Sequence, residues 1–370
     1  MRGGFRVFDC NRHVIEPVKL WRADPVDPVL GDADVRVSDD RIGVSVLGRP
    51  VSVPRLDFLA ADSYRSCFAN ALSAGFSSEA QLADMDREGV DAALLFPTSG
   101  MYAIWADHID TETSAALCRR YNDWLKSYCS AAPARLKGVA LLPLQDVKAS
   151  IAELRRAVEQ DGHVAFVMRP NPLLARRLHD PSYDALYAAA EELGVPILVK
   201  EAIGSLLPTM GQRYRDSIFH TKAVVEPFEI LLAFLSFFGA NVAERFPGLR
   251  VGFIGAGAGW LAYWLERHEE HWGAMPWGLD CASTSPADLL FPEQGFVAMD
   301  PWESTVVDVA ADVDVGCLVW GSHYPQPDAM GAFPDAVDKL LRAEGLPEDA
   351  KRKVLWENAA RLFRLREAGT

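Results

Sequence analysis

Several features that would assign a function directly are missing from this sequence of 370 residues. The six cysteines form no CxxC pair and no zinc-like spacing, so no zinc motif is predicted. Cys317, in the apolar run VGCLVW, is typical of a reduced buried thiol. No apolar run approaches the roughly 20 residues that cross a bilayer, and the opening MRGGFRVFDC contains no long apolar signal core. We therefore expect a cytoplasmic protein with no membrane partner.

Positive charge is also scarce. Lys and Arg number 37 against 51 Asp and Glu, and the net charge is −14. Because binding to phosphates needs a basic face, nucleic acid is not an expected partner. The one glycine-rich stretch that opens a helix, GAGAGW at residues 255–260, lacks the GxGxxG pattern and its downstream acidic residue. A dinucleotide cofactor is therefore not expected either.

Apolar segments that alternate with helical ones make up most of the chain. Hydrophobic residues are 49% of the composition, with 10 Trp and 18 Phe, which is ample for a large core. Runs typical of buried strands lie at 7–8, 91–96, 136–144, 164–169, 196–200, 250–254, 295–299 and 317–321, and helical patterns lie at 80–88, 111–130, 147–160, 183–193, 227–245, 260–271 and 303–311. This alternation indicates a parallel sheet covered on both faces. Eight such strand–helix units in a chain of this length favour an α/β fold, the (β/α)8 TIM-type barrel.

The domain organisation follows from the same pattern. We expect a single domain over residues 1–370, with an insertion at residues 18–75 after the first strand. The insertion contains DVRVSDDRIGVSVLGRPVSVP, in which alternating valines are interrupted by turn residues. This pattern predicts a small β-hairpin.

Polar side chains follow the predicted strands, where a parallel barrel places its chemistry. In RVFDCNRHVIEP, residues 6–17, Asn11 and His13 are two positions apart and point to the same side of an extended strand. Together they could share a metal ion or a substrate, although Asn11 as a turn cap and His13 as an ordinary loop histidine are equally compatible with the pattern. The other candidates at strand ends or in the loops after them are Arg12, Tyr102, Trp105, Arg169, Lys200, Glu201, His220, Glu226, His323 and Tyr324.

Three of these side chains invite specific interpretations. Arg169 ends a buried strand and either pairs with a surface carboxylate or faces an anion. Lys200 either extends outward to solvent or lies desolvated in the cavity, where it would suit acid–base or imine chemistry. Glu226 precedes Pro227, an expected first helical position, so it either caps that helix or has a catalytic role.

Ordered matches along nearly the whole chain point to a known family. They are DCNRHVIEP (9–17), DMDREGVDAALLFPTSGMY (84–102), YNDW (121–124), LKGVALLPLQD (136–146), MRPNP (168–172), EPFE (226–229), ERFPGLRVGF (244–253), GWLAYWLER (259–267) and WGSHYPQPD (320–328). With these, the chain resembles the amidohydrolase-related family that includes aminocarboxymuconate-semialdehyde decarboxylase and the resorcylate-type decarboxylases. The resemblance implies a barrel, often dimeric, with one divalent metal in its mouth.

The resemblance also implies a ligand set, which this chain has rewritten. In the family the metal is usually held by four ligands. Strand one supplies an acidic or His residue and a His, strand five supplies a His, and strand eight supplies an Asp. Here Asn11 takes the first position and only His13 is kept, and Lys200 stands where the strand-five His would be. The remaining changes are Gly255 at the acid–base position of strand six, His323 and Gln326 in GSHYPQ where the family has GSDYPH, and Glu226 where close relatives often have His. Because the scaffold around these positions is intact, we interpret the pocket as repurposed.

The leading hypothesis is a small-molecule enzyme without a catalytic metal or other cofactor. It would be a lyase, decarboxylase or cyclase of secondary metabolism, in which Lys200 supplies the metal's charge and His13, His323 and Glu226 move protons. Predicted substrate-binding residues are Asn11, Arg12, Tyr102, Trp105, Arg169, Glu201, His220 and Tyr324. The expected substrate is aromatic or carboxylated, and the expected assembly is a homodimer. Two alternatives stay open: a decarboxylase or hydrolase with Zn or another divalent metal on His13, His323 and Glu226, and a non-catalytic binding protein.

Overall fold

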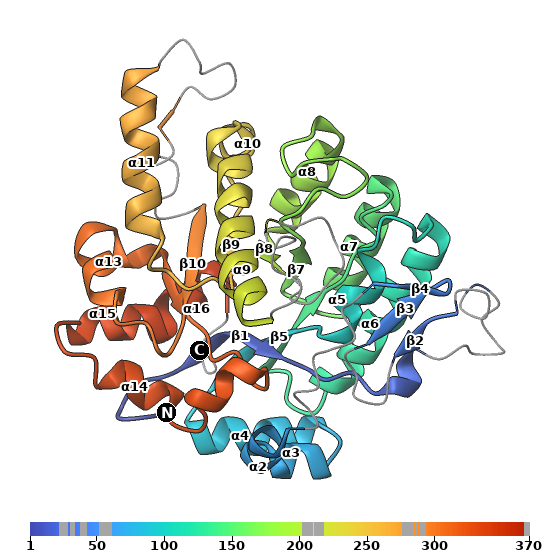
Figure 1. Ribbon diagram of the computed structural model, residues 1–370, viewed down its shortest axis with the longest axis horizontal. Coiled ribbons are helices and arrows are strands. Elements are labelled where there is room, and N and C mark those ends of the chain that lie inside the picture. Colours follow the sequence, from blue (N-terminus) through green and yellow to red (C-terminus); the bar gives the residue numbers. More distant parts are fainter. Residues whose placement is uncertain are drawn as a thin grey trace.

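The core of the protein is one sheet of parallel strands. The computed structural model describes residues 1–21, 34–37, 43–51, 61–201, 218–275 and 294–365, with single positions at 29, 210, 284, 285 and 288. The sheet follows the order β1-β5-β6-β7-β8-β9-β10-β11 (Figure 1). Its strands are β1 (Phe8–His13), β5 (Ala92–Phe96), β6 (Leu136–Ala140), β7 (Ala165–Met168), β8 (Ile197–Lys200), β9 (Val251–Ile254), β10 (Gly295–Met299) and β11 (Leu318–Trp320). The predicted (β/α)8 barrel is confirmed.

The two end strands of this sheet, β1 and β11, meet and close the barrel. The His323 amide donates to the Asn11 carbonyl at 2.8 Å, and the His13 amide donates to the Tyr324 carbonyl at 2.7 Å. The approach is close, because a Cβ added at Gly321 would lie 2.4 Å from the Cβ of Asn11. Glycine is therefore required at this point of the seam.

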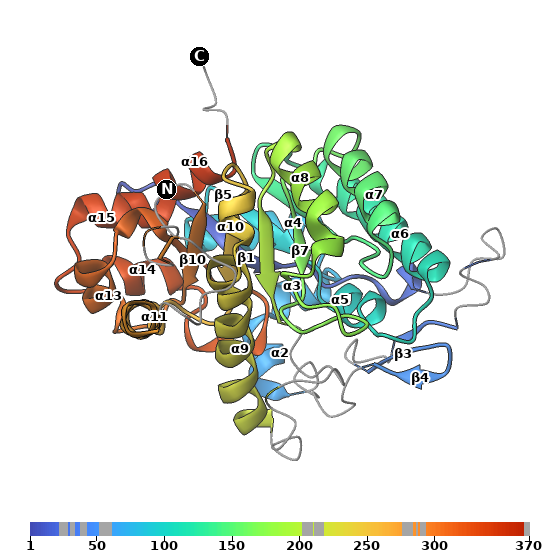
Figure 2. The same ribbon diagram turned by 90° about the horizontal axis from the view of Figure 1, so that it is seen from above.

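Helices surround the sheet in the order that the sequence predicts (Figure 2). They are α4 (Ser78–Glu88), α5 (Ser99–Ile104), α6 (Thr111–Cys129), α7 (Val147–Glu159), α8 (Asp184–Leu193), α9 (Ile218–Phe234), α10 (Val242–Arg245), α11 (Leu261–Ala274), α13 (Val306–Asp312), α14 (Ala336–Leu341), α15 (Glu348–Arg352) and α16 (Asn358–Leu362). The side chains of Ser77, Asp110 and Asp146 accept from backbone amides at the starts of α4, α6 and α7. These caps satisfy amides that have no partner inside the helix.

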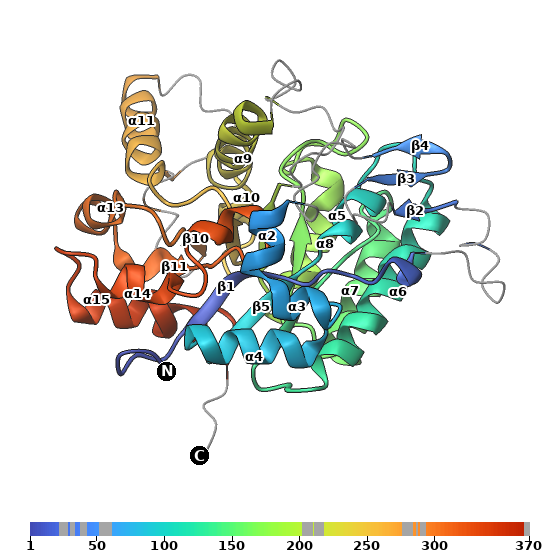
Figure 3. The ribbon, with the colours of Figure 1, turned by 60° about the horizontal axis from the view of Figure 1, so that its bottom comes forward.

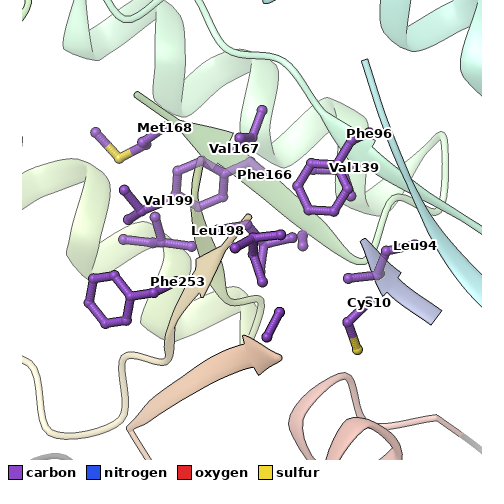
Figure 4. Packing of buried hydrophobic residues seen from close by; sticks show 14 of the residues in the cluster. Cys10, Leu94, Phe96, Val139, Phe166, Val167, Met168, Leu198, Val199 and Phe253 are labelled. Atoms are coloured by element: carbon purple, nitrogen blue, oxygen red, sulfur yellow. The ribbon is translucent and has the colours of Figure 1, made fainter. Parts of the chain in front are cut away.

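The strand residues are buried on both faces, which explains their nearly unbroken apolar sequence. All five residues of β5 and all four of β7 are buried. Figure 4 shows Leu94, Phe166 and Leu198 from three of these strands packed in one cluster. Among the cysteines described, Cys317 is buried and free, as expected; Cys281 lies outside the described residues. None of the described helices is long and apolar enough to span a membrane.

The segment between β1 and α4 contains a second, small sheet and two short helices. β2 (Arg36–Val37), β3 (Val44–Val46) and β4 (Arg49–Pro50) pair antiparallel, in agreement with the predicted hairpin. Parts of the expected insertion at 18–75 lie outside the described residues. The helices α2 (Asp62–Cys67) and α3 (Ala69–Ser73) lie beside α4 on one side of the barrel (Figure 3).

One predicted helix boundary is wrong. The sequence places a helix start at Pro227, but α9 runs from Ile218 to Phe234 with Pro227 inside it. Glu226 therefore lies within a helix and does not cap its N-terminus. A proline is tolerated there at the cost of one backbone hydrogen bond. α9 packs against α11, where the rings of Phe234 and His268 lie 5.9 Å apart.

Candidate active site

A cavity opens at the carboxyl ends of the barrel strands, with about 390 Å³ of empty space that includes open solvent. Side chains from separate segments of the chain meet in it, as expected for the mouth of a parallel barrel. It is lined by His13, Pro97, Thr98, Met101, Tyr102, Lys200, Glu201, Glu226, His323, Gln326 and Asp328. All four predicted catalytic residues, His13, Lys200, Glu226 and His323, are among them. Of the predicted substrate-binding residues, Tyr102 and Glu201 also line this cavity.

Lys200 ends β8 and points into the cavity. Its side chain is buried, with 5% of the residue exposed, and its Nζ donates to Oδ1 of Asn11 at 3.0 Å. A Cβ built on Gly255 would lie only 2.7 Å from this Nζ and 3.9 Å from Oε1 of Glu226. The absence of a side chain at residue 255 therefore makes room for the lysine amine.

His323 follows β11 and lies between two carboxylates. Its Nε2 lies 2.5 Å from Oδ1 of Asp300, and its Nδ1 lies 3.6 Å from Oδ2 of Asp328. Burial opposes protonation, but the charge and hydrogen bond of Asp300 outweigh burial and raise the pKa of His323 above its usual value of 6.5. The nearby Lys200 acts in the opposite direction. His323 is thus favoured as an imidazolium held between two carboxylates.

His13 ends β1 and has a defined tautomer. Its Nδ1 lies 2.9 Å from the Pro97 carbonyl, which can only accept. Nδ1 therefore carries a proton, and in the neutral ring the lone pair is on Nε2. Glu16 fixes the residues that follow Pro97. Its carboxylate accepts from the amides of Thr98, Ser99 and Gly100 at 2.9, 2.9 and 3.1 Å.

Acidic side chains form another part of the cavity wall. Glu201 is 3% exposed, and burial, followed by the charge of Glu229, raises its pKa well above the usual value of 4.5. Burial also raises the pKa of the Tyr102 hydroxyl, with Glu201 and Glu226 adding to the effect. Burial therefore favours the neutral form of Glu201, which can donate a hydrogen bond, more than it would in an exposed carboxyl group.

The structure places Arg12 and Tyr324 away from the cavity. The Arg12 guanidinium is fully buried, with Nη1 lying 2.5 Å from Glu88 and 3.3 Å from Asp9. It also stacks on the Tyr324 ring, 3.8 Å from its centroid, and the Tyr324 hydroxyl donates to Asp84 at 2.5 Å. These groups connect β1 to α4 and do not face a substrate.

Arg169, Trp105 and His220 are also absent from the cavity lining. The Arg169 guanidinium donates to the carbonyls of Trp105, Asn171 and Pro172 and forms an ion pair with Asp107 at 2.8 Å. Its donors therefore hold two loops together. His220 is an exposed residue in the first turn of α9.

The structure adds two acidic residues that the sequence analysis did not select. Asp300 directly follows β10, so its position at the end of a buried strand was a readable signal. Asp328 lies in the turn after β11, at 3.6 Å from His323. No sequence pattern identifies His323 as the partner of either residue. For Asp300, which follows β10, the partner comes from the end of a different strand, β11.

The donor set does not fit a divalent metal. Lys200 cannot act as a ligand while protonated and repels a dication, and both ring nitrogens of His323 face carboxylates. Across the ranges that the structure describes, no group of three or more His, Cys, Asp or Glu side chains is placed to hold a metal ion. The candidate ligands His13, His323 and Glu226 line one cavity but do not form such a group.

Comparisons with known proteins agree with the fold and identify the family. A family model described as Amidohydrolase matches residues 8–365. The 2-amino-3-carboxymuconate-6-semialdehyde decarboxylase of Dictyostelium discoideum is 28% identical over 200 residues, which are 54% of this chain and 52% of that protein. The match thus spans about half of this relative. The gamma-resorcylate decarboxylase of Rhodococcus jostii is 26% identical over 278 residues, 69% of this chain and 79% of that protein.

Solved structures share the fold over almost the whole chain. An amidohydrolase from Mycobacterium avium subsp. paratuberculosis superposes with a TM-score of 0.74 at 19% identity, covering 97% of this chain and 99% of that one. A dihydroxybenzoic acid decarboxylase from Polaromonas, solved with bound manganese and 2-nitroresorcinol, gives a TM-score of 0.68 at 18% identity and covers 98% of both chains. At these identities the likeness extends to the fold alone.

Proposed function

Because this chain belongs to the amidohydrolase family, whose relatives include decarboxylases, we propose that it is a lyase that decarboxylates a small unsaturated carboxylic acid without a catalytic metal. The observation that carries the proposal is the buried Lys200 amine, held 3.0 Å from Asn11 in the cavity. A positive charge at this point can bind a carboxylate and stabilise the electron pair released as CO2 leaves. The dihydroxybenzoic acid decarboxylase from Polaromonas was solved with bound manganese, which is also a positive charge.

His323 is the proposed proton donor. As an imidazolium it can transfer a proton to the substrate carbon that bears the carboxylate. The C–C bond to the carboxylate then breaks, its electron pair returns to the unsaturated system, and water restores the proton to His323. Asp300 is a positioning residue, because it orients the imidazole and favours its charged form.

The remaining cavity residues orient the substrate. Asn11 positions the Lys200 amine, and His13 offers its Nε2 lone pair as a proton acceptor. Met101 and Tyr102 give the wall an apolar surface that suits an aromatic ring or a polyene. Glu201, as a neutral acid, can hydrogen-bond to a hydroxyl or carbonyl group of the substrate. The homodimer and the place in secondary metabolism expected from the sequence belong to this proposal as well.

The second candidate is a decarboxylase or hydrolase with Zn²⁺ or Mn²⁺ on His13, His323 and Glu226. It is favoured by the manganese in the solved neighbour and by the Nε2 lone pair of His13, which could serve as a ligand. It requires His323 to give up one carboxylate partner and its proton.

Metal content and CO2 release separate the two candidates. The purified protein would be loaded with Mn²⁺ or Zn²⁺, dialysed against metal-free buffer and analysed by elemental mass spectrometry. CO2 release from 2,6-dihydroxybenzoate and other small unsaturated acids would then be assayed before and after treatment with EDTA. We expect less than stoichiometric metal and activity that survives EDTA. Stoichiometric metal that disappears in His13→Ala, with activity restored only by metal, would establish the second candidate. Turnover unchanged in Lys200→Ala and His323→Ala would rule out this site altogether.

A further inference from the structure

We propose that Lys200 is a covalent nucleophile, whose Nζ forms an imine with the ketone carbon of a 3-oxo acid. The proposal deepens the proposed function and rests on it, because it names the substrate class of the same cavity. A protonated imine keeps a positive charge in the same place but attaches it to the substrate. The amine then acts as an electron sink and not only as a counter-ion.

The position of the amine suits an attack on a bound carbonyl. Lys200 is the one lysine among the described residues that line the cavity, and it ends a barrel strand, which fixes its backbone. Its Nζ donates to Oδ1 of the Asn11 side-chain amide at 3.0 Å, which orients the amine. The Phe96 ring lies 5.6 Å from Nζ on another side. These contacts hold a buried amine at the wall of the cavity.

Space around the amine is the second requirement, since imine formation passes through a tetrahedral carbinolamine. Gly255 provides part of it. Any side chain there would begin 2.7 Å from Nζ. Gly255 has a φ of +98°, which L residues rarely adopt, so the backbone is also shaped to keep this position without a side chain.

Attack on the carbonyl requires the amine in its neutral form, so the proposal includes the loss of a proton from Nζ before the carbon–nitrogen bond forms. A lysine in a desolvated site next to another cationic group is an established way to obtain a nucleophilic amine. Here the neighbouring cation is His323, whose charge Asp300 maintains. Oε1 of Glu226 lies 3.9 Å from the same Cβ position of Gly255, and this carboxylate can take up the proton that the amine releases.

The reaction balances without any co-reactant except water. The amine adds to the ketone carbon, water carries away the ketone oxygen, and a protonated imine forms. The bond between the α-carbon and the carboxylate breaks, CO2 leaves, and the electron pair moves into the imine to give an enamine. His323 donates a proton to the enamine carbon, and water then hydrolyses the imine to release the methyl or methylene ketone and Lys200. The carboxylate must be β to the imine carbon, which is why a 3-oxo acid is the substrate class.

Reductive trapping tests this directly. The full-length protein would be mixed with acetoacetate or benzoylacetate and sodium cyanoborohydride, and adducts would be mapped by peptide mass spectrometry. We expect a hydride-dependent adduct on Lys200 at least ten times more frequent than on Lys137, a half-buried lysine outside the cavity whose pKa is also lowered by burial. It should be absent in Lys200→Arg, which keeps the charge but cannot form an imine, and reduced in Asn11→Asp, which would hold the amine protonated.

The outcomes separate this proposal from the proposed function. If both oxo acids label Lys200 no more than Lys137, the imine is overturned. The imine is also overturned if the Lys200→Arg variant retains wild-type turnover. CO2 release from 2,6-dihydroxybenzoate with Lys200 unlabelled would keep the decarboxylase and discard the imine. An adduct on Lys200 without CO2 release from any acid would keep the imine and discard the decarboxylase.

Discussion

The Nζ atom of Lys200 lies 2.7 Å from the point where a Cβ on Gly255 would stand. Gly255→Ala should therefore displace the amine and force a positive φ on alanine. We expect a stability loss of about 1–3 kcal/mol and a loss of activity on the order of 100-fold, because a displacement of about 1 Å has this effect in an active site. Chemical denaturation and turnover would be measured on the same preparation.

Gly273 in α11 provides the matched control. A Cβ there meets nothing within 4 Å, and the residue lies in a helix, so Gly273→Ala should stabilise the fold by up to ~1 kcal/mol. Its turnover should equal that of the wild type. If Gly255→Ala behaved like this control, the cavity would not need the space beside Lys200.

The charge of His323 predicts a pH dependence of turnover. Its pKa in the folded protein is raised above 6.5, by Asp300 against the opposing effect of burial, so the active imidazolium is present at low pH and is lost as pH rises through that raised pKa. Asp300→Asn removes the raising charge. The alkaline limb of the profile should then move to lower pH, while KM changes little. An unchanged limb would mean that another group donates the proton.

The buried pair of Arg12 and Glu88 should dominate local stability. Both side chains are fully buried and 2.5 Å apart. Glu88→Gln leaves the guanidinium charge with Asp9 alone, and we expect a loss of about 3–5 kcal/mol. The exposed pair of Arg155 and Glu192 is the control, since Glu192→Gln should change stability by less than ~1 kcal/mol. Equal effects in urea denaturation would show that burial of the Arg12 pair has little energetic weight.

Glu201 predicts a second pH effect, this time on stability. Its pKa is raised in the folded protein by burial and by Glu229, so the folded state favours the neutral form. Stability from this group is fully present below its unfolded pKa of about 4.5 and is lost as pH rises toward the folded pKa. Glu201→Gln does not titrate. Its advantage over the wild type in thermal unfolding should grow from pH 5 to pH 8, and parallel curves would contradict the assignment of a neutral Glu201.

The barrel could be predicted because the signal is repeated. Each strand, such as 251–254 or 318–320, is a short apolar run buried on both faces, and a helix with its own caps separates it from the next. The helix start at Pro227 was mispredicted because proline is common at helix starts, and a local pattern cannot show that packing of α9 sustains the helix upstream.

The cavity residues could be predicted only in part. His13, Lys200 and His323 follow strands and meet at one end of the barrel, as the fold requires. Arg12 could not be placed, because the pairing of β1 with β5 shifts between Asp9 and Arg12. Such a bulge changes the direction of the side chains that follow it. The partnership of His323 with Asp300 depends on two strands meeting in space, which a single sequence does not record.

The hydrogen bonds that close the barrel involve the same residues as the proposed chemistry. The amides of His323 and His13 bond across the seam to the carbonyls of Asn11 and Tyr324. A molecule held by the side chains of Asn11, His13 and His323 would therefore also hold β1 and β11 together, because it binds only the closed form. The exchange rates of two backbone amide hydrogens would then report whether the cavity is occupied, for any bound molecule and before any product is known.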